Sequence, residues 1–129
     1  MLIYPAICHF EDGEYWCEFP DLPGCFSQGA TDSEIVANAR EALGCHLESY
    51  LEKGEPLPKP TKITDIKVSG QDFATYVSCD IENTGKSVRK NVTLPEWLCR
   101  RAEKASVNFS QTLQESLIKK LGVLENATA

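Results

Sequence analysis

The first third of the chain alternates apolar and polar side chains with the period of two that is typical of β-strands. Residues 2–10 predict a strand with two largely apolar faces. Pro5 removes a backbone donor from it, so one edge of this strand should be free or bulged there. A turn at residues 11–14 leads into a second alternating run at residues 15–19, which predicts a β-hairpin. A turn rich in proline and glycine follows, and then a short third strand at residues 25–28.

From residue 31 the apolar spacing changes to that of an amphipathic helix. Thr31 and Glu34 have the spacing of a capping box, and Gly54 is placed to end the helix. His46 falls on the apolar stripe, and we interpret it as a packing residue at the edge of a core, without a catalytic role. The stripe consists of Ile35, Ala39, Ala42, His46 and Tyr50, widened by Leu43, Leu47 and Leu51.

After the helix, residues 54–62 contain three prolines and predict a stiff connector. Period-two alternation returns at residues 74–82, where Val77, Cys79 and Ile81 should face inward and the residues between them outward. Residues 1–84 therefore predict an α+β domain with the order β-β-β-α-β.

The last third of the chain predicts a strand followed by two short helices. In residues 87–94, Arg89, Asn91 and Thr93 point to one side and the apolar residues to the other. A lone strand of this length is not stable, but pairing with the same strand of a second copy would make an antiparallel ribbon. Pro95 should open the first helix.

A break at residues 107–110 suits a turn between the two helices, with Asn108 able to adopt the left-handed conformation and Ser110 placed to cap the second helix. Gly122 should end that helix. A strand and two short helices cannot enclose a core, whereas two copies can, so residues 85–129 predict a homodimerisation domain. The apolar side of the second helix consists of Leu113, Leu117, Ile118 and Leu121.

Charge divides the chain in the same way. The net charge of −6 combines a net −10 in residues 1–85, with 5 Lys or Arg against 15 Asp or Glu, and a net +4 in residues 86–129, with 8 against 4. The first part should therefore face a cationic partner and the second a polyanion. A hydrophobic content of 42% in 129 residues is enough for one modest core and one smaller element.

Nothing in the sequence indicates a membrane span or an export signal, and we expect a soluble, cytoplasmic protein. The six cysteines then behave as small buried hydrophobic residues, because nothing signals export to a compartment where disulfides form and no pair has the CxxC spacing of a zinc site. We expect no metal and no cofactor.

Residues 4–60 resemble the N-terminal domain of HicB antitoxins. The similarity rests on YPAICHFEDGEYWCEFPDLPGCFSQG, with its DLPGC turn after an aromatic strand, on the helix that follows, and on GEPLPKP. The resemblance implies a partial ribonuclease H-like fold that binds a small toxin ribonuclease, HicA. Residues that could pair with cationic groups of such a toxin cluster along the first hairpin: Glu11, Asp12, Glu14, Glu18 and Asp21.

Residues 88–121 resemble the ribbon-helix-helix DNA-binding domain, which places a paired ribbon in the major groove. Carried onto this chain, the resemblance implies that Arg89, Asn91 and Thr93 read base edges. Arginine can bind guanine, asparagine can bind adenine, and threonine can contact the thymine methyl group. Contacts to phosphate would come from the start of the second helix, where backbone N–H groups are exposed, and from a lysine that could extend toward the backbone. These residues are Lys90, Asn108, Ser110 and Gln111.

The favoured hypothesis is an antitoxin that covers a HicA-like toxin ribonuclease and binds the operator DNA of its own operon as a homodimer, with room for a higher assembly when toxin is bound. The first alternative is a stand-alone ribbon-helix-helix regulator whose N-terminal domain senses a small ligand. The second is a metal-dependent, ribonuclease H-like nuclease, which would need several carboxylates converging from strand interiors. We expect no enzymatic activity, because the first strand offers no such carboxylates.

Overall fold

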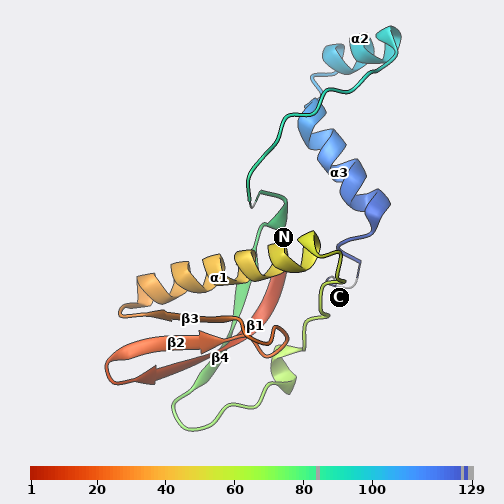
Figure 1. Ribbon diagram of the computed structural model, residues 1–129. Coiled ribbons are helices and arrows are strands. Elements are labelled where there is room, and N and C mark those ends of the chain that lie inside the picture. The colour runs from red at the N-terminus through yellow and green to blue at the C-terminus, as the bar shows by residue number, and fades with distance from the viewer. Residues whose placement is uncertain (84, 126, 128–129) are drawn as a thin grey trace. The chain divides into compact units, whose positions relative to one another are not determined.

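The computed structural model describes residues 1–83, 85–125 and 127, which form two compact units (Figure 1). The first unit comprises Met1–Gly85 with Val123–Ala129, and the second comprises Lys86–Gly122. Over the residues described, the fold is α+β, with one antiparallel sheet and three α-helices. The elements of the first unit are β1 (Leu2–Glu11), β2 (Glu14–Glu18), β3 (Phe26–Gly29), α1 (Asp32–Glu52), η1 (Ile63–Asp65), β4 (Phe73–Cys79) and η2 (Ile81–Asn83), and those of the second are α2 (Glu96–Lys104) and α3 (Phe109–Leu121).

The four strands are ordered β3-β2-β1-β4, so β1 is central and has a neighbour on both sides. The β1–β2 hairpin is confirmed: Glu11 pairs with Glu14, and the two-residue loop has positive φ at Asp12 (52°) and Gly13 (79°), the backbone of a type I′ turn. β2 pairs with β1 only from Ile7 onward, while Pro5 is in register with Tyr76 of β4. As predicted, the edge of β1 toward β2 is therefore free at Pro5.

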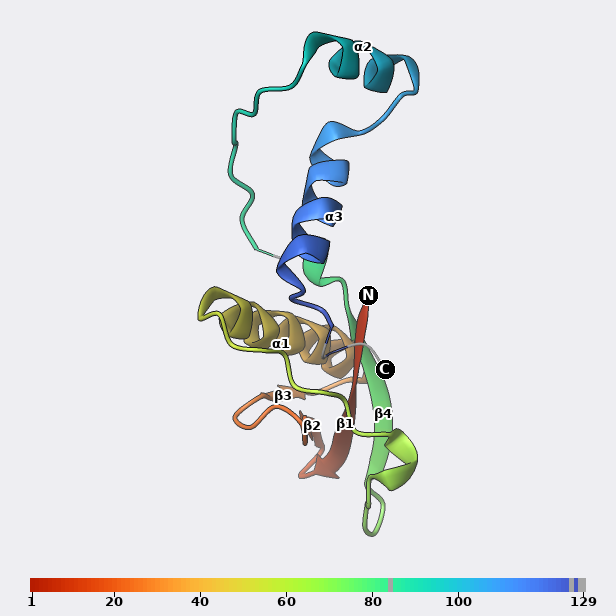
Figure 2. The same cartoon turned by 90° about the vertical axis from the view of Figure 1, so that its right-hand side faces the viewer.

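Helix α1 packs across one face of the sheet (Figures 1 and 2), and the core of the first unit lies between the two layers. Thr31 caps the helix as predicted, because its Oγ1 accepts from Glu34 N–H at 3.2 Å, whereas Glu34 Oε2 accepts from Ala30 N–H at 2.8 Å, one residue before the cap of a regular capping box. Gly54 follows the helix with φ of 71°, as expected for a residue that ends it. The residues of β1 and α1 that build this core are Leu2, Tyr4, Ala6, Cys8, Ile35, Ala39, Leu43 and Leu47.

Gly29 shows how closely β3 approaches the start of α1. A Cβ atom on Gly29 would lie 2.6 Å from Ile35 N and 2.9 Å from Glu34 C, both of them backbone atoms. The glycine is therefore required by space and not by its backbone angles. The end of β3 and the first turn of α1 are therefore in direct backbone contact.

Tyr4 is completely buried and donates its hydroxyl to Pro58 O at 2.6 Å, which ties the connector to β1. Burial raises the pKa of Tyr4 to about 12, because the ionised phenolate would lose its hydration. A raised folded-state pKa contributes stability that is fully present below the unfolded pKa of about 10 and is lost as the pH rises through 12.

We expect the unfolding free energy of the wild-type protein to fall by up to about 2–3 kcal/mol more than that of Tyr4→Phe between pH 9 and pH 12. Denaturant unfolding of both proteins at several pH values measures this. Other groups that titrate in this range cancel in the difference. A gap between the two proteins that stays constant across the range contradicts the assignment.

Two predictions from the sequence need correction, one on the last strand of the first unit and one on the cysteines of both units. β4 ends at Cys79, and Ile81 lies in the η2 turn, although it is buried as expected. Cys45 is exposed on α1 and Cys99 is only partly buried, whereas the other four cysteines are buried thiols. Cys45 lies outside the buried residues of α1, and α2, which carries Cys99, has no buried residue.

In the second unit, α2 begins directly after Pro95, as predicted. The cap of α3 is Asn108 and not Ser110: Asn108 Oδ1 accepts from Gln111 N–H at 3.0 Å, so the helix begins at Phe109. Asn108 has φ of −82°, and the left-handed residue of the turn is Ser106, with φ of 57°. Gly122, with φ of 63°, ends α3 as predicted. Residues 86–94, all within the described part of the chain, form no strand in the isolated chain.

Candidate functional site

One face of the sheet is covered by α1, and we call the opposite face the open face. The register fixes its members, since Glu11 lies opposite Glu14, His9 opposite Trp16, and Ile7 opposite Glu18. β3 continues the pattern with Phe26 opposite Glu18. The open face thus carries, from three neighbouring strands, Ile7, His9, Glu11, Glu14, Trp16, Glu18 and Phe26.

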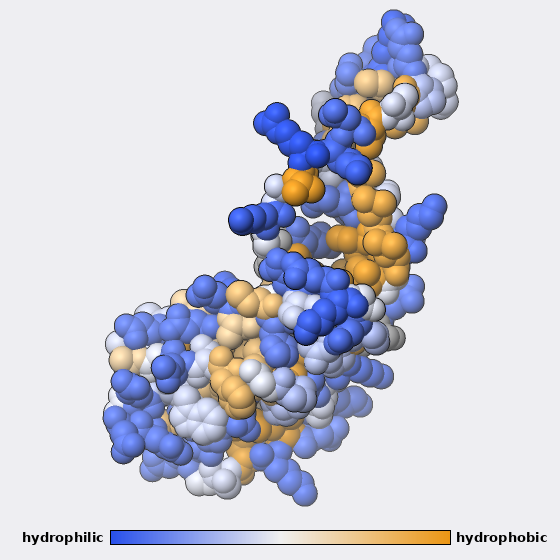
Figure 3. Space-filling view, in the orientation of Figure 1, coloured by the Kyte–Doolittle hydropathy of each residue, from blue (hydrophilic) through white to orange (hydrophobic). Residues whose placement is uncertain are grey.

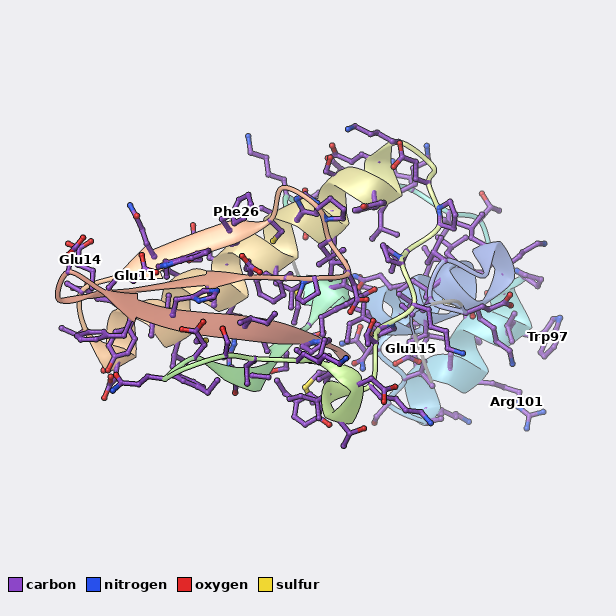
Figure 4. The ribbon with its side chains drawn as sticks, turned by 90° about the horizontal axis from the view of Figure 1, so that it is seen from below. Glu11, Glu14, Phe26, Trp97, Arg101 and Glu115 are labelled. Carbon is purple, nitrogen blue, oxygen red and sulfur yellow. The ribbon has the colours of Figure 1, made fainter. Side chains whose placement is uncertain are left out.

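The open face is acidic. None of the four strands that the structure describes contains a Lys or Arg, and their three carboxylates, Glu11, Glu14 and Glu18, all belong to this face. Figure 4 shows Glu11 and Glu14 together at the hairpin end of the sheet, and Phe26 on β3. Three of the five acidic residues singled out from the sequence are therefore brought onto one surface.

His9 anchors the middle of the open face. Its Nδ1 lies 2.8 Å from Asp72 Oδ2 and its Nε2 lies 3.9 Å from Glu18 Oε2. The ring stacks on Trp16, with centroids 3.9 Å apart and planes at 16°. Sequence reasoning missed His9, Trp16 and Asp72, because the cluster depends on the register of β1 against β2 and on the loop before β4.

The other two acidic residues singled out from the sequence have roles in the fold. Asp12 occupies the first positive-φ position of the hairpin turn, which Asp tolerates better than most side chains. Asp21 accepts two hydrogen bonds from Thr61, one from its backbone N–H at 2.9 Å and one from its side-chain hydroxyl. Asp21 therefore joins the turn after β2 to the connector and is less available to a partner.

A groove of about 420 Å³ opens on the other side of the sheet, between α1 and the edge strand β4. Its walls are mostly apolar, and Asp32 and Arg40 are its charged residues. Asp32 interacts with the hydroxyl of Tyr15, and this hydrogen bond raises the pKa of Tyr15. The groove thus has balanced charge, unlike the open face.

The second unit leaves its apolar side chains uncovered. Neither α2 nor α3 contains a buried residue. Apolar side chains gather over α3 in the space-filling view (Figure 3), and in Figure 4 Trp97 and Arg101 project away from α2. Val88 is 88% exposed and Leu117 is 48% exposed. The large apolar residues exposed in this unit are Val88, Val92, Leu94, Trp97, Leu98, Val107, Phe109, Leu113, Leu117 and Leu121.

The residues expected to contact DNA are all at the surface of the second unit. Arg89, Lys90, Asn91 and Thr93 are exposed along residues 86–94. At the start of α3, Asn108, Ser110 and Gln111 are exposed as well. The Gln111 backbone N–H is already held by the Asn108 cap, and its side chain donates to Glu115 at 3.2 Å. On α2, Arg100 pairs with Glu96 one turn away.

Within residues 1–83, 85–125 and 127, no group of three or more His, Cys, Asp or Glu side chains is arranged to hold a metal ion. No helix in the described part of the chain has the length and apolar character needed to cross a bilayer.

The protein-family model that describes the HicB-like antitoxins of bacterial toxin–antitoxin systems matches residues 4–121 of this chain. A protein from the rep–hol intergenic region of Haemophilus phage HP1 is 37% identical over 106 residues, which cover 79% of this chain and 80% of the phage protein. A solved toxin–antitoxin complex from Streptococcus pneumoniae contains a chain that is 27% identical, with a TM-score of 0.59 over 93% of this chain and 99% of that one.

A second solved complex, of the toxin HicA3 with the antitoxin HicB3, contains a chain that is 29% identical, with a TM-score of 0.53 over 61% of this chain and 99% of that one. The family model spans most of the sequence and both units, and the phage relative exceeds a third in identity over most of its own length. The chain therefore belongs to the HicB-like antitoxin family of bacterial toxin–antitoxin systems.

Proposed function

We propose that this antitoxin neutralises a HicA-like toxin ribonuclease through its first unit, and that its second unit forms a homodimer that binds operator DNA and represses its own operon. Neutralisation needs no chemistry in this account, because covering the toxin's RNA-binding surface is sufficient. A solved complex of HicA3 with HicB3 among its structural neighbours supports a toxin partner.

The observation that carries the proposal is the uncovered apolar surface of the second unit. α2 and α3 have no buried residue, although each has apolar side chains at helical spacing. Burying a leucine side chain is favourable by roughly 1.5–3 kcal/mol, so a unit that buries none of its own gains most by sharing a core. A second copy supplies the same surface, as a two-fold symmetric interface requires.

Dimerisation would also bring the DNA-contacting residues into one arrangement. Two copies of residues 87–94 paired as a ribbon would place Val88 and Val92 against the helices and Arg89, Asn91 and Thr93 on the outer side. The capped start of α3 would lie toward phosphates, where unpaired N–H groups and the helix dipole attract anions. The net charge of +4 in residues 86–129 suits this partner.

Replacing Arg89 or Asn91 by alanine should weaken operator binding by ~1–3 kcal/mol, because each loses a bidentate base contact. Toxin neutralisation should be unchanged. Titration of operator and unrelated DNA at one salt concentration measures both affinity and discrimination. Lys120→Ala, at the end of α3, is the control and should leave discrimination between the two DNAs intact. If Arg89→Ala impairs DNA binding and neutralisation equally, the residue serves folding and the assignment is wrong.

One observation favours the regulator alternative. The groove beside α1 has a volume of about 420 Å³ and mostly apolar walls, within the size range of small-molecule sites. A regulator of that kind would bind operator DNA without any toxin and respond to a metabolite. Co-purification with the product of the neighbouring gene separates the two functions, since only an antitoxin should retain a small basic toxin.

A further inference from the structure

We propose that the open face of the sheet is the surface on which the toxin docks, and that it receives a cationic segment whose apolar side chain packs on Phe26. This inference rests on the antitoxin function proposed above and adds to it the surface used and the chemistry of the partner segment. Of the open face and the groove beside α1, the open face is the one with an unbalanced negative charge.

Charge complementarity selects the open face. Its three strand carboxylates have no Lys or Arg among the four described strands to neutralise them. The groove beside α1, in contrast, combines Asp32 with Arg40, and Asp32 is engaged by Tyr15. A cationic partner thus gains from the open face and gains little from the groove.

The pairing of Glu11 with Glu14 indicates that this charge is kept for a partner. The two residues lie directly opposite each other next to the turn, and like charges in opposed positions destabilise a hairpin. A Lys at either position would form a favourable cross-strand pair, so folding alone gives no reason for two glutamates. A local conflict of this kind is expected where a surface serves binding.

The apolar part of the surface lies next to the carboxylates. Phe26 is 60% exposed on the edge strand β3, directly opposite Glu18 in the register. Glu18 borders the His9–Trp16 stack, which Asp72 holds from the side. The His9 ring beside Glu18 is thus held by two neighbours, Trp16 and Asp72.

The test uses a substitution that should favour folding and weaken toxin binding. Glu14→Lys replaces a like-charge pair by an opposite-charge pair, so the melting temperature of the toxin-free protein should rise slightly or stay the same. Affinity for the purified toxin, measured by titration calorimetry, should fall by about tenfold or more, because a lysine now faces the partner's cations. Phe26→Ala should also weaken binding, by about fivefold or more.

Glu41→Lys is the matched control, since Glu41 is exposed on α1, away from the open face, and the change in net charge is the same. It should alter the affinity by less than about threefold. If Glu14→Lys and Glu41→Lys weaken binding equally, or neither does, the open face is not the docking surface. A smaller assembly of toxin-free Glu14→Lys, with unchanged toxin affinity, would assign the face to a second copy and overturn the proposal.

Failure of the underlying function looks different. If the wild-type chain does not bind the toxin at all, the antitoxin role proposed for this chain is wrong, whatever the variants do. If the wild-type chain binds and the open-face variants bind as well as it does, only the docking surface is wrong.

Discussion

Leu117→Lys should convert the protein from a dimer to a monomer and abolish operator binding. Leu117 lies on α3 and is 48% exposed in the isolated chain, so a lysine there does not disturb the fold of one copy. In the dimer, each of two symmetric copies would lose the burial of a leucine, roughly 3–6 kcal/mol in total. The dissociation constant of the dimer should therefore rise by about 100-fold or more.

Light scattering measures the mass of this variant, and an electrophoretic shift measures its binding to operator DNA. Thr112→Lys is the control, because Thr112 is exposed on the same helix, on the side away from Leu117. The substitution adds the same charge as Leu117→Lys. It should remain dimeric and bind DNA. A Leu117→Lys protein that stays dimeric would show that the apolar side of α3 is not the interface.

Leu43→Ala should destabilise the first unit by about 2–5 kcal/mol, because Leu43 is fully buried between α1 and the sheet and its truncation leaves a cavity. A loss of this size is a large part of the stability of a small domain, so toxin binding should fail at physiological temperature. Chemical denaturation with two probes, one for each unit, measures the effect.

Val36→Ala is the matched change on the same helix, because Val36 is 62% exposed. It should change the unfolding free energy by less than about 0.5 kcal/mol. Equal destabilisation by the two variants would mean that α1 does not pack on the sheet through the face described here.

Much of the first unit can be predicted from short-range patterns. The Asp-Gly turn, the alternation of β1 and the Thr31 cap of α1 each depend on residues close in sequence, and each is found in the structure. The errors are also local. In the first unit, Ile81 continues the alternation but lies in a 3₁₀ turn. In the second unit, Asn108 takes the place of Ser110 as the cap of α3, because its side chain accepts from Gln111 N–H.

The candidate site is only partly accessible to the same reasoning. Acidic residues of the hairpin can be found from composition, but the alternation does not say which of them share a surface with β3. That depends on the register that sets Phe26 opposite Glu18. The cluster of His9 with Asp72 joins residues from opposite ends of the unit's sequence, and no local pattern indicates it.

Residues 87–94 are a different case, since their predicted structure requires another molecule. The alternation of Val88, Arg89 and their neighbours describes one strand of a two-stranded ribbon, and a single strand has no partner for its backbone groups. The isolated chain accordingly shows these residues exposed and without strand pairing. The ribbon stays a prediction about two copies.

Amide hydrogen exchange of residues 88–94 in the wild-type protein, at micromolar concentration and without DNA, tests that prediction most directly. In a paired antiparallel ribbon, alternate amides donate across the two-fold axis and should exchange slowly, and Leu117→Lys should remove this protection. Exchange of all these amides at the rate of an unfolded peptide, in a protein whose first unit is protected, would contradict the account.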